Sequence, residues 1–277
     1  MLMKTSASPF IIALILLLSA CDEPTEAPRV EIPVVVSGAG LTPVTTDLGY
    51  AIEVTEARMA FNNLAFTIAG EAHANFFWQN LSQAIIPSAH AHPGHFAGGE
   101  VTGELPGEFL VDWLANNEQQ LGVATLLAGT YMGVNFTFAR ASEDWLEAGD
   151  PLIGHTAIFA GLASRQGTAI PFTITIDSPK DRELIGAPLT RADDASNSFQ
   201  ARIDASSSSG TLLLQLVTED PVKHNTLFDG IDFAALHTDS EGTVHIGPTS
   251  QGASEDAYNL FRRTFQLTDH YMVYYQD

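Results

Sequence analysis

The chain has 277 residues, of which 33 are acidic and 12 are lysine or arginine, so its formal net charge is −21 at pH 7. This excess of acid argues against a nucleic-acid-binding role, because contacts to phosphate need a basic face. The single cysteine excludes an intrachain disulfide and a zinc site built on several cysteines. The length suffices for one large β domain or two modest ones.

Residues 1–20 have the pattern of a cleavable signal peptide. Lys4 supplies a basic start, and an unbroken apolar run from Phe10 to Leu18 follows, which is too short to span a membrane. The run ends in Leu18-Ser19-Ala20-Cys21, which resembles the lipobox of bacterial lipoproteins, where a lipidated cysteine becomes the first residue after cleavage. We therefore expect export to the cell envelope and anchoring to a lipid bilayer through acylated Cys21. The folded part would then face the periplasm or the cell surface, and the choice between inner and outer membrane stays open.

Residues 21–29 are expected to form an acidic tether. The stretch from Asp22 to Pro28 contains proline and no large apolar residue, which is typical of a short disordered linker. The remainder, 30–277, is expected to be a single β-rich domain that includes a helical segment at about 224–268.

The central part of the chain indicates β structure. Short apolar or alternating runs are separated by glycine and proline, and the turn-like sequence Ser164–Gly167 suggests a hairpin. This pattern predicts a mainly β fold, an antiparallel β-sandwich or a barrel-like domain. The expected strands are 30–36, 50–54, 57–68, 134–138, 156–162, 169–176 and 212–217.

The C-terminal fifth has a different pattern. Apolar residues at helical spacing predict two short helices over 225–236 and 255–267, and Ser254 is a candidate cap for the second. A closing strand is expected over 271–275. Because this block is small, we expect it to cover the β core rather than to fold alone.

The segment Pro87–His95 contains three histidines within six positions: His90, His92 and His95. In an extended backbone His90 and His92 project to the same side, and Pro93-Gly94 can turn the chain to bring His95 back. Neutral imidazoles suit zinc, copper, nickel and iron(II), whereas calcium and magnesium prefer oxygen. The sequence therefore predicts a transition-metal site, with zinc first and copper second because no methionine cluster accompanies the loop. A solvated surface loop is the alternative.

Further ligands are expected from outside this segment. His155 is the first candidate because Gly154 before it permits close approach of another segment. His73 comes next, although hydrogen-bonded packing is the commoner use of a lone histidine. Glu100 is a third candidate, as a ligand or as a group that orients one.

Catalysis finds little support in the sequence. A Gly-x-Ser-x-Gly elbow, the His-Glu-x-x-His helix motif and a phosphate-binding glycine loop are all missing. Two alternatives to metal acquisition stay open. One is a surface module that binds glycan or a partner protein through aromatic residues such as Phe76–Trp78, Trp113 and Trp145. The other is a metal-dependent enzyme that uses the same imidazoles with a bound water.

Two resemblances accompany these residues. The stretch Glu56–Phe61, followed by the His-rich stretch Ala91–His95, resembles uncharacterised lipoproteins of environmental bacteria. The general layout also looks distantly like the methanobactin-associated periplasmic copper-binding proteins, which are β-rich, exported and bind copper through histidine. The diagnostic cysteines and ligand spacing of that family are not matched, so no site residue is carried over from it.

The combined expectation is a lipid-anchored protein that binds zinc or copper through its His-rich loop. Three imidazoles without a fourth fixed ligand favour exchange over permanent retention of the ion. The protein would then buffer the metal or pass it to a metal transporter or outer-membrane receptor.

Overall fold

The computed structural model describes residues 28–68, 100–115, 118–179, 182–193 and 199–277. Strands dominate the described residues, in which the one α-helix, α3 (Ala253–Phe265), lies near the C-terminus. The expectation of a mainly β fold is thus confirmed. The strands are β1 Arg29–Ser37, β2 Val44–Thr45, β3 Ala51–Ile68, β4 Glu100–Asp112, β5 Gln119–Leu127, β6 Gly129–Phe138, β7 Ala157–Arg165, β8 Thr168–Ile176, β9 Glu183–Arg191, β10 Ala201–Ile203, β11 Thr211–Leu216, β12 Val244–Ile246 and β13 Tyr271–Gln276.

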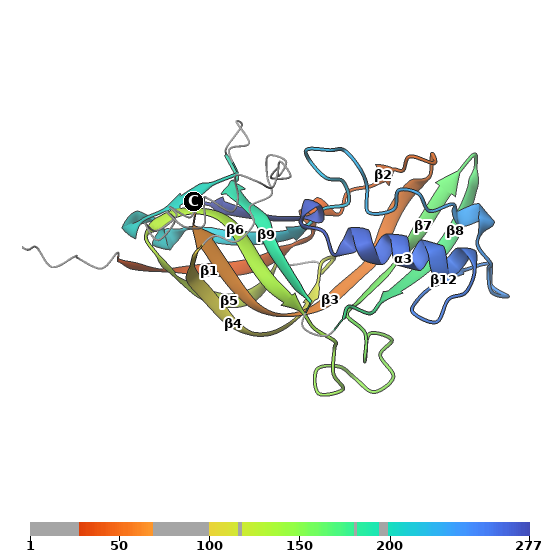
Figure 1. Ribbon diagram of the computed structural model, residues 1–277, viewed down its shortest axis with the longest axis horizontal. Coiled ribbons are helices and arrows are strands. Elements are labelled where there is room, and N and C mark those ends of the chain that lie inside the picture. The colour runs from red at the N-terminus through yellow and green to blue at the C-terminus, as the bar shows by residue number, and fades with distance from the viewer. Residues whose placement is uncertain (1–27, 69–99, 116–117, 180–181, 194–198) are drawn as a thin grey trace, which may run out of the picture.

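Eight of these strands form a closed ring, in the order β3-β4-β5-β1-β11-β13-β9-β6 and back to β3. Closure depends on β6, which pairs with β9 on one side and with β3 on the other. An interior of this size is filled by side chains. Phe136 shows this, because its ring lies 5.1 Å from Phe61 on β3 and 5.2 Å from Tyr271 on β13, between ring centroids. The ring is therefore a packed, barrel-like core, on the left in Figure 1.

A second layer extends from the N-terminal half of β3. The C-terminal half of this 18-residue strand belongs to the ring, whereas Ala51 to Met59 pair with β7, which continues to β8 and β12. Helix α3 packs on this layer (Figure 1), with Phe261 and Phe265 against Phe159 of β7. The same buried cluster includes residues of the ring and of α3. The expected role of the C-terminal block as a cover is therefore confirmed for this helix.

Strands β7 and β8 form the expected hairpin. Pairing runs without a shift from Ala157–Ile176 to Arg165–Thr168, which leaves a two-residue turn of Gln166 and Gly167. Both turn residues have positive φ, 52° and 82°. This conformation matches the twist of the flanking strands and favours glycine at the second position.

Two predictions about strands need correction. Residues 50–54 and 57–68 were expected as separate strands, but they are one strand, β3, with a bulge between Val54 and Glu56. The sheet is also mixed rather than wholly antiparallel, because β1–β11, β8–β12 and β9–β13 are parallel pairs.

The helix expected over 225–236 is wrong. This segment consists of turns and one short 3-10 helix, Phe233–Ala235. The hydroxyl of Thr226 accepts a hydrogen bond from the amide N–H of Phe228, and the carboxylate of Asp229 accepts one from the amide N–H of Thr226. Gly230 has a positive φ of 79°. These contacts take up backbone donors that a helix would need. Leu227, Phe228, Ile231 and Phe233 are nevertheless buried, as their spacing indicated, and Leu236 is partly buried.

The second helix is confirmed but its cap is not. Helix α3 begins at Ala253, and Gly252 occupies the N-cap position with no side-chain cap hydrogen bond. Ser254 therefore lies inside the first turn. No helix among the described residues is both long enough and apolar enough to cross a membrane. The expected signal peptide, Cys21 and most of the tether lie outside the described residues.

Candidate functional site

The predicted metal ligands fall into two groups. His73, His90, His92 and His95 lie within 69–99, outside the described residues, as does the side chain of Glu100. The backbone of Glu100 begins β4 and pairs with Ile68, the last residue of β3. The His-rich segment therefore leaves and re-enters the fold at the adjacent ends of two ring strands.

His155 is the one predicted ligand whose side chain the structure describes. It lies just before β7, and the next residue, Thr156, accepts a hydrogen bond from the amide of Ala60 on β3. Ala60 and Ile68 are eight positions apart on β3, a distance of about 26 Å along a strand. A chain of eight residues, such as that between His92 and Glu100, spans at most about 28 Å. The chain between His92 and Glu100 is therefore long enough for His92 and His155 to bind the same ion, although its length does not require them to do so.

The ring of His155 is held by a carboxylate. Its Nδ1 lies 2.6 Å from Oδ1 of Asp177, which directly follows β8. The other oxygen of Asp177 lies 3.4 Å from Nη2 of Arg140, whose Nη1 donates to the carbonyl of Gly154. The imidazole is about one-third exposed. Its orientation is therefore fixed by a chain of three charged or polar groups.

This arrangement leaves the second ring nitrogen of His155 available. No hydrogen bond to Nε2 occurs within the described part of the chain. Histidines that bind a metal usually donate the other ring N–H to a carboxylate, which fixes the tautomer and makes the ligating nitrogen more basic. His155 has this arrangement with Asp177, which the sequence analysis did not identify.

The signal for Asp177 was present in the sequence. A two-residue turn at Gln166-Gly167 fixes the hairpin register, so residues just before β7 lie beside residues just after β8. Extending the pairing of Ala157 with Ile176 by one or two positions places Asp177 next to His155.

A complete metal centre is not formed by the described residues alone. Among them, no group of three or more histidine, cysteine, aspartate or glutamate side chains is close enough to hold an ion. His155 and Asp177 supply one oriented ligand, and further donors must come from elsewhere.

The other described histidines are dispersed. His224 pairs with Glu219 and His245 with Asp239, and both are exposed. His270 is fully buried, and its Nδ1 donates to the carbonyl of Val217. Burial lowers the pKa of His270, against the opposing effect of nearby carboxylates. The neutral form of His270 is therefore favoured inside the protein.

A polar hollow lies on the outer face of the ring, close to Arg140. Its volume is about 690 Å³. The lining combines ring residues with residues of the connections after β6 and β8, namely Asn62, Glu108, Thr137, Arg140, Asp144, Trp145 and Ser178, among others. Of the tryptophans considered as surface aromatics, Trp145 lines this hollow, whereas Trp113 is buried in the core.

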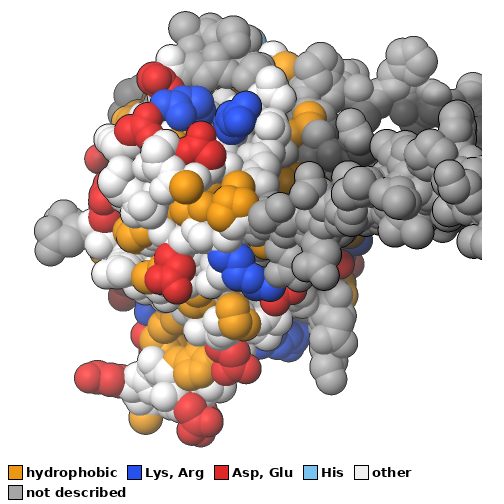
Figure 2. All heavy atoms as spheres, turned by 90° about the vertical axis from the view of Figure 1, so that its left-hand side faces the viewer, with side chains coloured by type: hydrophobic (Ala, Val, Ile, Leu, Met, Phe, Trp, Pro, Cys, Tyr) orange, Lys and Arg blue, Asp and Glu red, His pale blue; other side chains and the backbone are white. Residues whose placement is uncertain are grey.

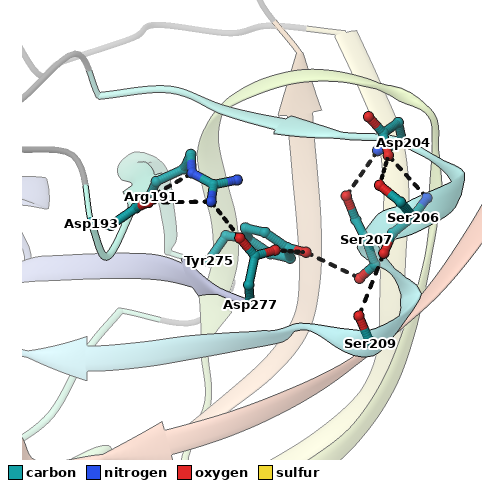
Figure 3. Close-up of polar contacts among 8 residues, drawn as sticks. All are labelled: Arg191, Asp193, Asp204, Ser206, Ser207, Ser209, Tyr275 and Asp277. Atoms are coloured by element: carbon teal, nitrogen blue, oxygen red, sulfur yellow. Dashed lines mark hydrogen bonds and ion pairs between the residues drawn. The ribbon is translucent and has the colours of Figure 1, made fainter.

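A second polar network lies where β9 and β13 end, near the C-terminus (Figure 3). Arg191 of β9 contacts the carboxylates of Asp193 and Asp277, and the hydroxyl of Tyr275 donates to Asp277. The hydrogen bonds from Arg191 lower the pKa of both carboxyl groups. These contacts tie the last residue to β9, so we assign the network a structural role.

The end of the molecule shown in Figure 2 has no dominant charge. Acidic, basic and hydrophobic side chains are interspersed among its described residues. The described residues on this face do not form the continuous basic surface that phosphate contacts need.

No protein-family model, curated protein or solved structure matches this chain.

Proposed function

We propose that the chain is an exported, lipid-anchored protein that binds a transition metal, zinc first and copper second, through its His-rich segment. The membrane anchor would be the acylated Cys21. The bound metal would be buffered or passed to a transporter or outer-membrane receptor. Exchange suits such a role, because a site with an open position releases its ion more readily than a closed structural site.

The structural observation that supports the proposal is the hydrogen bond between His155 and Asp177. Its Nδ1–Oδ1 distance of 2.6 Å, and an Nε2 with no hydrogen bond from any described residue, give an imidazole that is oriented before any ion arrives. Pre-orientation lowers the cost of binding. Three histidines at 90, 92 and 95 supply the additional donors that the described residues lack.

The test is calorimetric titration of the purified full-length chain with Zn²⁺ and with Cu²⁺. We expect the native protein to bind and a His90→Ala, His92→Ala, His95→Ala triple variant to lose this binding. Asp177→Asn keeps the size of the side chain but weakens its hold on His155. It should reduce affinity by about 10-fold or more if His155 is a ligand.

His224→Ala is the matched control, since His224 also uses Nδ1 to contact a carboxylate but is not among the predicted ligands. Its affinity should equal that of the native protein. Equal binding by the native chain and the triple variant would remove the His-rich segment from the proposal. Absence of binding by the native chain would contradict the metal function as a whole.

A further inference from the structure

The polar hollow beside Arg140 has a floor built from three adjacent strands. Asn62 of β3 is paired with Glu108 of β4 on one side and with Thr137 of β6 on the other. The neighbouring Phe61 and Phe136 are buried in the ring. Side chains alternate along a strand, so the three polar ones lie together on the outer face. The floor is therefore a rigid row of an amide, a carboxylate and a hydroxyl.

Asn62 supplies the observation that points to a ligand. Its Oδ1 is fully shielded from solvent, yet it has no hydrogen-bond partner among the described residues. Buried acceptors of this kind are rare in folded proteins and need an explanation. An amide oxygen accepts hydrogen bonds, so a group that satisfies it must carry a donor such as O–H or N–H. Because this oxygen has almost no surface open to the hollow, the Asn62 amide must turn toward the ligand to accept that bond.

Trp145 forms part of the wall and is fixed in place. It is half-buried and packs against a small apolar cluster of Ala60, Ala141, Leu152 and Ile158. An anchored indole offers a broad apolar surface at little cost in conformational entropy. The C–H face of a ring that carries hydroxyl groups elsewhere would pack well on it.

The charges of the lining select against anions. Glu108 and Asp144 are carboxylates, and the guanidinium of Arg140 is already paired with Asp177. A phosphate or carboxylate ligand would meet like charge there. A wholly apolar ligand would leave the polar floor unsatisfied. A neutral molecule with many hydroxyl groups fits both constraints.

We propose that this hollow binds a short neutral saccharide, with hydroxyl groups on the Asn62–Thr137 floor and a sugar face against Trp145. Its volume of about 690 Å³ lies within the usual range for ligand pockets. None of its floor residues is a predicted metal ligand, although Arg140 of its lining also contacts Asp177, the partner of His155.

The test is calorimetric titration of the full-length chain with maltotriose, cellotriose and chitotriose, each up to about 10 mM. The lipid-anchored chain is kept in a polyoxyethylene detergent, which carries no sugar that could compete for the site. EDTA is added to remove any bound metal. We expect at least one trisaccharide to bind with a Kd of about 1 mM or tighter. Binding that persists in EDTA separates this proposal from the metal function.

Two variants locate the site. Asn62→Ala and Thr137→Val should each raise the Kd by about tenfold, as loss of a polar contact predicts. Thr137→Val preserves the shape and the strand propensity of the side chain. Its affinity for the saccharide therefore tests the location of the site if Asn62→Ala does not fold. Asn259→Ala, on the exposed face of α3, is the matched control and should bind as the native chain does. Binding of none of the three sugars, or unchanged affinity in folded Asn62→Ala and Thr137→Val, would overturn the proposal.

Discussion

Exposure and hydrogen-bond partners differ between the histidines His155 and His270. His155 is partly exposed and held by Asp177, whereas His270 has no exposed surface and its Nε2 has no hydrogen-bond partner among the described residues. The first arrangement suits ligand binding, and the second suits a neutral packed ring. The same residue type therefore has different chemistry at the two positions because burial and partners differ.

The buried His270 should make the fold sensitive to mild acid. Its pKa is lowered in the folded state, chiefly by burial, whereas an unfolded histidine takes up a proton near pH 6.5. The unfolded chain then binds more protons, so the free energy of unfolding should fall as pH drops from about 6.5 to about 5.5, by no more than about 1 kcal/mol. Urea denaturation at pH values across this range measures the change.

The control for this prediction is His270→Asn, which retains an N–H donor near the position of Nδ1. The variant should be less stable at neutral pH but should lose less stability between about pH 6.5 and about pH 5.5. An equal loss in both proteins would show that His270 is not the source of the acid sensitivity.

At this scale the sequence offered His155 as a candidate ligand, which stays a prediction, but did not point to Asp177 or Asn62. Asp177 follows from hairpin register and could have been found. Asn62 could not, because its neighbours Glu108 and Thr137 are 46 and 75 positions further along the chain. Only the long-range pairing of β3 with β4 and β6 brings them together.

At the scale of elements, periodicity predicted strands better than it predicted helices. The hairpin, β1, β11 and β13 follow from apolar patterns that local backbone geometry respects. The segment 225–236 has helical spacing, yet Thr226 and Asp229 hold it in turns. Four of its apolar residues pack into the main core although the backbone is irregular. The spacing of apolar residues alone does not distinguish such a segment from a helix.

This irregular segment is fastened to the second layer by Tyr50. The hydroxyl of Tyr50 donates to Asp232 and accepts the amide of Ala234, and its ring lies 4.1 Å from the guanidinium carbon of Arg165. Tyr50→Phe removes both hydrogen bonds and leaves the Ala234 amide without this partner. We expect the free energy of unfolding to fall by about 1–2 kcal/mol, as measured by urea denaturation.

Tyr274→Phe is the comparison for Tyr50→Phe. The hydroxyl of Tyr274 makes no hydrogen bond among the described residues, although burial raises its pKa. Its removal should change stability by less than about 0.5 kcal/mol. Similar losses in the two variants would mean that the Tyr50 hydroxyl does not fasten the segment.

At the scale of the whole molecule, the closed ring of strands sets the positions of the His-rich segment and His155 relative to each other. The 69–99 segment, with its histidines, joins the adjacent ends of β3 and β4, while His155 precedes Thr156, which accepts a hydrogen bond from Ala60 in the middle of β3. The sequence predicted the β class but not this closure. Closure depends on pairs such as β1 with β11 and β3 with β6, which join residues far apart in the chain.

The central claim is that histidine nitrogens of this chain gather around one transition-metal ion. X-ray absorption spectroscopy at the zinc edge, on the full-length protein loaded with one equivalent of Zn²⁺, counts and identifies the ligands. We predict three or more imidazole nitrogens at about 2.0–2.1 Å from the ion. A shell made up of oxygen, or a protein that retains no zinc after passage through a desalting column, would contradict the claim.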